Sequence, residues 1–184
     1  VTTFLHEFGH ALHGMFSKCT YGSTSMDGVS RDFVELPSQF MENFALEKEW
    51  LDTWAVHYQT GEKIPQEYID KIKKSSNFQA GYASDRQLSF GMIDMAWHTI
   101  TEPVTEPLVD FEQRAMGKTE IMPLVKGSAF SPAFGHIFAG GYAAGYYGYK
   151  WAEVLDADAF SLFKQNGIFD KATAESFRRN VLEK

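Results

Sequence analysis

His6, Glu7 and His10, close to the start of the chain, have the residue types and the H-E-x-x-H spacing of a metal site. Two residues four apart on an α-helix lie about 40° apart in projection and about 6 Å apart along the axis. Their imidazoles could therefore reach one ion from the same face, and neutral imidazole is a common ligand of Zn²⁺. Glu7 lies about 100° around the helix from His6. Its carboxylate would lie beside the ion, where it could act as a base toward water.

The same five residues have a second interpretation that needs no metal. A helix with partly buried histidines and a solvated Glu7 would carry the same pattern, and the pattern alone leaves both interpretations open. Gly9, between the two histidines, would let another segment or a substrate come close. His13 lies about 10 Å along the axis from His6, too far to share its ion. We expect His13 to pack inside the protein or to support the ligands.

A catalytic zinc needs three protein ligands and one open position, so a third ligand must come from elsewhere in the chain. Glu35 is the best candidate, because the loop 17–30 is long enough to return a second helix alongside the first. Asp32 and Glu35 could instead form a capping box without any metal. Pro37 agrees with a helix start in either case. The local pattern does not separate a ligand from a cap.

The elements that would position these side chains are helices. Apolar residues recur at helical spacing, and no run alternates as a strand would. The expected helices cover residues 2–18, 32–58, the segment that begins at Pro65, 77–100, 141–164 and 171–183, with Pro103, Pro107 and Pro123 interrupting the middle of the chain. This pattern predicts a mainly α fold, a compact array of several helices.

The segment 130–151 is rich in glycine and aromatic residues. The glycines predict a hinged segment with His136, followed by a helix with Tyr142, Tyr146 and Tyr149. Tyr142 and Tyr149 would share a helix face, since they are two turns apart. A phenol can donate a hydrogen bond to a developing oxyanion at neutral pH, and a hinged segment could deliver it. The aromatic residues also step by four, as in a packing stripe, and the local pattern favours packing.

The composition of the chain limits the classes of protein to which it can belong. The chain has 184 residues with 44% hydrophobic content, which suits one domain with a substantial core. The formal net charge of -7 argues against nucleic acid or an anionic membrane as a partner. Cys19 is the single cysteine, so a disulfide scaffold is excluded and a reducing, cytoplasmic compartment fits.

Three blocks of the sequence, HEFGHALHGMFS, RDFVELPSQFMENF and FSPAFGHIFAGGYAAGYYGYKWAEVLDADAF, carry a resemblance that covers positions 2–160. Together they resemble the M3 family of zinc metallopeptidases, which includes thimet oligopeptidase, neurolysin, oligopeptidase A and peptidyl-dipeptidase. The third block resembles the bacterial peptidyl-dipeptidase branch most closely. By position, the resemblance implies the metal ligands His6, His10 and Glu35, the catalytic residues Glu7, His136 and Tyr149, and the substrate-binding residues Tyr142 and Tyr146.

The resemblance also implies an architecture and an activity. Family members are helical proteins of several hundred residues with two halves around a deep channel. Residues 1–184 would then form a single catalytic domain, the catalytic half of such a channel and a fragment of a longer, bacterial peptidase whose missing N-terminal part is its partner. One Zn²⁺ per chain would serve the hydrolysis of short peptides, with release of C-terminal dipeptides. The alternative is a helical module that binds a peptide or a partner and catalyses nothing.

Overall fold

Helices form nearly all the regular structure in the part of the chain that the computed structural model describes, residues 1–122 and 125–184. Within these residues the only extended pairing is an isolated antiparallel bridge between Val56 and Lys63. The predicted mainly α fold is therefore confirmed. Pro123, one of the prolines expected to interrupt the chain, lies outside the described residues.

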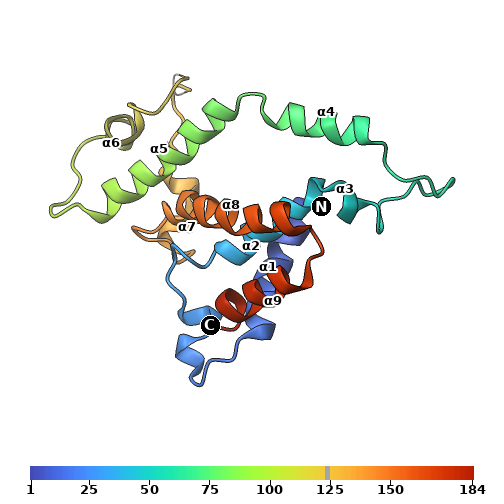
Figure 1. The fold of residues 1–184 in the computed structure, drawn as a ribbon. Helices are drawn as coiled ribbons and strands as arrows, with labels where there is room; N and C mark the ends of the chain where they lie inside the picture. The colour runs from blue at the N-terminus through green and yellow to red at the C-terminus, as the bar shows by residue number, and fades with distance from the viewer. Residues whose placement is uncertain (123–124) are drawn as a thin grey trace. The chain divides into compact units, whose positions relative to one another are not determined.

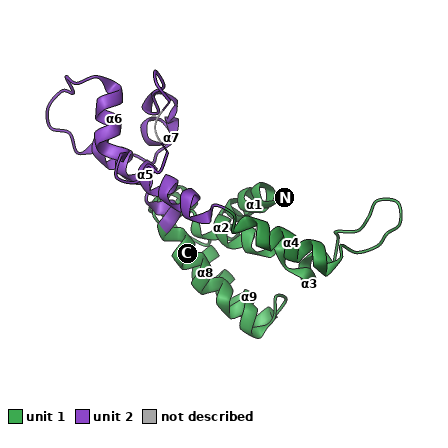
Figure 2. Cartoon of the chain, turned by 90° about the horizontal axis from the view of Figure 1, so that it is seen from above, with its two compact units in different colours: residues 1–78, 151–184 green, residues 79–150 purple. Residues whose placement is uncertain are grey.

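The chain divides into two compact units, shown in different colours in Figure 2. Unit 1 comprises residues 1–78 and 151–184, and unit 2 comprises residues 79–150. The helices of unit 1 are α1 (Thr2–Phe16), α2 (Leu36–Glu42), α3 (Lys48–Leu51), α4 (Gln66–Ser76), most of α8 (Gly148–Asn166) and α9 (Lys171–Phe177). Those of unit 2 are α5 (Ala80–His98), α6 (Leu108–Met116) and α7 (Gly135–Phe138). The single catalytic domain over residues 1–184 stays a prediction.

Phenylalanine rings from three helices form the core of unit 1. Phe40 on α2 stacks on Phe177 of α9 with 4.0 Å between ring centroids, and it meets Phe160 and Phe163 of α8 edge to face. Such aromatic pairs add about 0.5–1.5 kcal/mol each beyond the area they bury. The cluster holds α2 against α8 and α9, which lie close together in Figure 1. It thereby fixes the helix that begins beside Glu35.

Helices α1 and α2 touch at Gly9. A Cβ atom built on Gly9 would lie 2.3 Å from the carbonyl oxygen of Pro37 and 2.6 Å from the Cα of Ser38. Real Cβ atoms do not approach a backbone so closely, so only glycine lets the two helices meet at this point. The expected close approach at Gly9 is confirmed. It brings the histidine-bearing face of α1 against the first turn of α2.

Gly9→Ala is expected to lower the free energy of unfolding by about 3 kcal/mol, because backbone atoms must move to admit the methyl group. Gly91→Ala is the matched control, since a Cβ there meets nothing within 4 Å and alanine is the better helix former. Urea unfolding followed by circular dichroism measures both variants. A Gly9→Ala chain as stable as wild type would contradict the close contact.

Two of the predicted helices are wrong in their bounds. The helix expected over 32–58 is broken into α2, the turn Asn43–Leu46 and α3. The helix expected over 141–164 begins only at Gly148. Gly141 and Ala144 have φ angles of 83° and 53°, which an α-helix cannot contain. The aromatic spacing at 142–149 therefore belongs to a loop. None of the described helices is long and apolar enough to cross a membrane.

Candidate metal centre

Two imidazoles and one carboxylate meet where α1 packs on α2. The Nε2 atoms of His6 and His10 each lie 3.3 Å from the same carboxylate oxygen of Glu35, Oε2. One ligand atom from each of the three residues lies within 4.8 Å of the other two. The structure thus brings together the three residues that the sequence indicated as metal ligands.

The geometry of this cluster fits a zinc ion. Ligand atoms bonded at about 2.1 Å in a tetrahedral arrangement lie about 3.4 Å from one another. The two nitrogen-to-oxygen distances, 3.3 Å each, are close to that edge. Two imidazoles and a carboxylate are also a donor set that zinc uses in catalytic sites, where the fourth position stays open. The three residues would therefore hold the ion.

Glu35 is held in place from its own helix. Its side chain is only 2% exposed, and the hydroxyl of Ser38 lies 2.8 Å from Oε2 and 2.9 Å from the backbone carbonyl of Glu35. Glu35 occupies the N-cap position of α2 but makes no capping hydrogen bond through its side chain. The alternative of a capping box is therefore wrong, because this carboxylate turns toward α1 instead of toward its own backbone. Pro37 lies in the first turn of α2, as expected.

Glu42, which the sequence analysis missed, orients His6. Its Oε1 lies 2.6 Å from Nδ1 of His6, the ring nitrogen opposite the one that faces Glu35. A carboxylate on the second nitrogen fixes the tautomer and the plane of a ligating imidazole and makes it more basic. Glu42 follows Glu35 by seven residues, two helical turns, and this spacing was the available signal.

Glu42→Gln is expected to weaken zinc binding by about 10- to 100-fold, because the amide cannot accept a charge-assisted bond from Nδ1 and orient His6 as firmly. Titration against a zinc-selective chelator of known affinity measures the change. Glu153→Gln, which removes a carboxylate from the same pocket, is the control and should keep the wild-type affinity. Equal losses in both variants would show that only the local charge matters.

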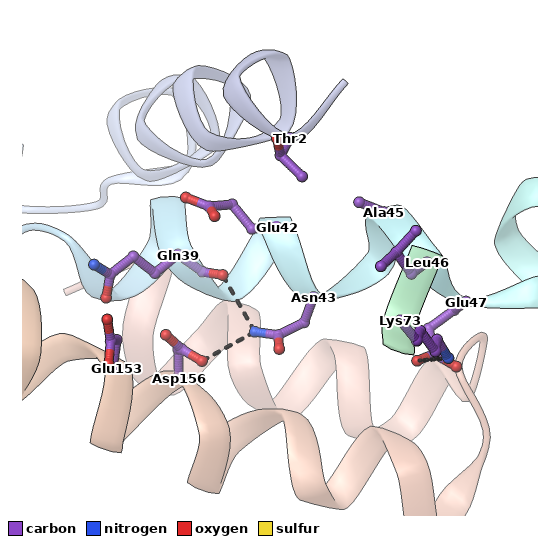
Figure 3. A pocket seen from close by; sticks show the side chains of 10 residues that line it. All are labelled: Thr2, Gln39, Glu42, Asn43, Ala45, Leu46, Glu47, Lys73, Glu153 and Asp156. Carbon is purple, nitrogen blue, oxygen red and sulfur yellow. Dashed lines mark hydrogen bonds and ion pairs between the residues drawn. The ribbon is translucent and has the colours of Figure 1, made fainter. Parts of the chain in front are cut away.

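The pocket beside Glu42 is acidic and has a volume of about 410 Å³. Figure 3 shows that Asn43 bridges two sides of it, donating to the backbone carbonyl of Gln39 at 3.2 Å and to Asp156 at 3.0 Å. Burial raises the pKa of Asp156 to about 6, and nearby Glu153 and Glu42 add to the shift. The carboxylates keep the potential negative near His6, which favours a cation at the cluster.

The remaining side chains of α1 differ in exposure. A hydrogen bond to Glu35 raises the pKa of His10, with further contributions from the charges of Glu35 and Glu7 that outweigh partial burial. Glu7 is exposed on the solvent side of α1. His13 is fully buried, and burial lowers its pKa. The expectation that His13 packs inside the protein is confirmed.

His136, Tyr142, Tyr146 and Tyr149 form one group of rings in unit 2. Tyr142 stacks on Tyr149 with ring centroids 5.0 Å apart, and Tyr146 lies 5.1 Å from Tyr149 and 6.2 Å from His136. Tyr146 belongs to the buried core, whereas Tyr149 is half-buried and His136 is exposed. The expectation that Tyr142 and Tyr149 share a helix face is wrong, because the loop brings them together instead. The catalytic and substrate-binding roles of these residues stay predictions.

The helical fold thus gathers the two histidines of an H-E-x-x-H helix and a buried glutamate into a candidate metal site. The family model described as peptidase family M3 matches residues 1–184, and the chain belongs to that family. It is 45% identical over 190 residues to oligopeptidase A of Escherichia coli (strain K12). This alignment covers 100% of the present chain and 27% of the relative.

Two further relatives refine this similarity. The organellar oligopeptidase A of Arabidopsis thaliana is 46% identical over 188 residues, covering 99% of this chain and 24% of the relative. The dipeptidyl carboxypeptidase of E. coli (strain K12) is 38% identical over 186 residues, covering 100% of this chain and 27% of the relative. The chain thus spans about a quarter of the length of these relatives. Identity favours the oligopeptidase A proteins over the peptidyl-dipeptidase branch that the third sequence block indicated.

Proposed function

We propose that this chain carries the catalytic centre of a zinc-dependent oligopeptidase that hydrolyses peptide bonds in short peptides. The observation that supports it most strongly is the convergence of His6, His10 and Glu35 at distances that fit tetrahedral zinc. A bound zinc ion would supply a Lewis acid that polarises a carbonyl group and lowers the pKa of water toward neutrality. Membership of peptidase family M3 supports the same reading.

Glu7 is the general base and acid in this proposal. It follows His6 directly on α1, it is exposed to solvent, and its charge acts on the ligand His10. An exposed carboxylate can take a proton from a water molecule during attack on the scissile carbonyl. It can then give that proton to the leaving amine, which completes the hydrolysis without any change in the protein.

Tyr149 and His136 are the proposed donors to the oxyanion of the tetrahedral intermediate. Tyr149 is the least buried of the three grouped tyrosines, so its phenol is the one best able to meet a substrate. Tyr142 and Tyr146 are the proposed substrate-binding residues. Burial raises the pKa of Tyr146 to about 12, helped by Tyr149, so its phenol stays protonated as a donor across the physiological range.

Two further features of the proposal are the mode of cleavage and the location of the protein. Oligopeptidase A proteins share more identity with this chain than the dipeptidyl carboxypeptidase, which favours cleavage within short peptides over release of dipeptides alone. The relatives include a probable cytosolic oligopeptidase A of A. thaliana, 45% identical, and the organellar one, 46% identical, and the cytoplasmic location that we propose rests on the single cysteine. The rest of the same polypeptide is the proposed partner that completes the substrate site.

A short quenched fluorescent peptide tests the proposal, with the purified chain and with the complete natural polypeptide that contains it. We expect cleavage that a zinc chelator abolishes and that added zinc restores, and mass spectrometry of the products shows whether dipeptides are released. Cleavage that continues after the metal has been removed would contradict the proposal. A chain that binds the peptide and one zinc ion without cleaving it would instead be a non-catalytic binding module.

A further inference from the structure

Asp94 on α5 is a buried carboxylate that no step of the proposed reaction uses. It is 1% exposed, and both of its oxygens are engaged by the loop that carries the tyrosines. The backbone N–H of Ala144 donates to Oδ1 at 2.9 Å, and the backbone N–H of Tyr146 donates to Oδ2 at 2.9 Å. One side chain thus clamps two peptide groups fifty residues and more further along the chain.

The loop at this clamp adopts a conformation that its sequence disfavours. Ala144 has a φ of 53°, a left-handed backbone that residues other than glycine adopt only when their surroundings enforce it. Its neighbour Gly145 donates to the carbonyl of Tyr142 at 2.9 Å, and Tyr142 donates to the carbonyl of His136 at 3.2 Å. The turn that results stacks Tyr142 on Tyr149.

His98 completes the surroundings of the carboxylate. Its Nδ1 lies 2.8 Å from Oδ1 of Asp94 and 2.8 Å from the backbone carbonyl of the same residue. A charge-assisted hydrogen bond between a carboxylate and a backbone N–H is about twice as strong as a neutral one. The carboxylate therefore accepts two hydrogen bonds from the strained turn and is paired with His98 on its own helix.

We propose that Asp94 is a positioning residue, which holds the loop 142–149 in the conformation that presents Tyr149 and Tyr142 to substrate. This inference rests on the proposed peptidase function and adds to it a residue outside the reacting groups. A carboxylate is required because it accepts at both oxygens. An asparagine of the same size accepts at only one oxygen and places an NH₂ group against the other backbone N–H.

Amide hydrogen exchange of the complete natural polypeptide tests the clamp directly. In Asp94→Asn we expect exchange at Ala144 and Tyr146 to accelerate by about 10- to 100-fold, with α5 unchanged. Glu112→Gln is the matched control. Glu112 is an equally buried carboxylate of unit 2 that accepts from the backbone N–H groups of Phe130 and Ser131. That variant should accelerate exchange at 130–131 and leave the tyrosine loop protected.

Steady-state cleavage of a quenched peptide tests the consequence. Asp94→Asn should lower kcat by about 10²-fold and raise KM by a smaller factor, with the wild-type zinc content, because the displaced loop carries both the oxyanion donor and the substrate-binding tyrosines. Unchanged exchange at Ala144 and Tyr146, or faster exchange with wild-type kcat, would overturn this inference alone. A wild-type polypeptide that cleaves no peptide would overturn it together with the proposed function.

Discussion

His10→Ala is expected to abolish stoichiometric zinc binding, from about one ion per chain to a trace. His10 supplies one of the three ligand atoms, and its loss leaves His6 and the Glu35 carboxylate, too few for a catalytic zinc site. The affinity for zinc should fall by more than about 10- to 100-fold, which is the loss expected when a residue that hydrogen-bonds to a ligand is removed. Metal analysis after exhaustive dialysis, with a chelator titration, measures the effect.

His10→Ala needs a second variant beside it, so that the loss of one zinc ligand is distinguished from unfolding of the chain. Glu35→Gln is that variant, because glutamine keeps the size of the buried side chain and the acceptor for Ser38 while weakening the ligand. His57→Ala is the matched control, a histidine in the turn before Lys63 whose ring lies outside the cluster. If His10→Ala and Glu35→Gln both keep one tightly bound zinc, the assigned centre is wrong.

Glu7→Gln is expected to lower kcat for peptide cleavage by about 10²- to 10⁴-fold, the range for removal of a general base. Glutamine is nearly the same size but cannot take a proton from water at neutral pH. Because Glu7 is exposed and is not one of the three ligands, the variant should fold normally and keep about one zinc per chain. Steady-state kinetics beside metal analysis measures both properties.

A loss of activity with retained zinc is the signature that distinguishes a base from a ligand. Glu67→Gln is the control, an exposed glutamate on α4 whose ion pair with Lys71 contributes little to stability. It should match wild type in kcat and zinc content. Equal cleavage by Glu7→Gln and wild type would remove Glu7 from the mechanism, whereas loss of zinc in Glu7→Gln would assign it to metal binding instead.

Helix periodicity and residue type were enough to predict α1 and its two histidines. The spacing of His6 and His10 follows from the geometry of any α-helix, and the structure places α1 over Thr2–Phe16, within two residues of the expected bounds. The mainly α class followed in the same way. Local information of this kind is reliable because a helix closes its hydrogen bonds between residues four apart.

The residues near Glu35 in the sequence do not show whether it is a metal ligand or a capping residue. Either role fits the residues from Asp32 to Pro37, and the outcome depends on which side chains α1 presents across the contact at Gly9. The loop at 142–149 is a second case. Its aromatic spacing suits a helix, yet Asp94, distant in sequence, binds two of its backbone N–H groups and holds Ala144 in a left-handed conformation.

The sequence by itself therefore determined the mainly α class, helix α1 with its paired histidines, and the place of Glu7 beside them, because all of these depend on near neighbours in the chain. Only the tertiary structure decided that Glu35 faces the histidines, that Glu42 supports His6 and that the tyrosines lie on a loop. Two of these depend on the buried carboxylates of Glu35 and Asp94, which cost free energy unless polar partners surround them. His6 and His10 face Glu35 from α1, and the backbone N–H groups that bind Asp94 lie about fifty residues along the chain, so the local sequence around each carboxylate does not reveal these partners.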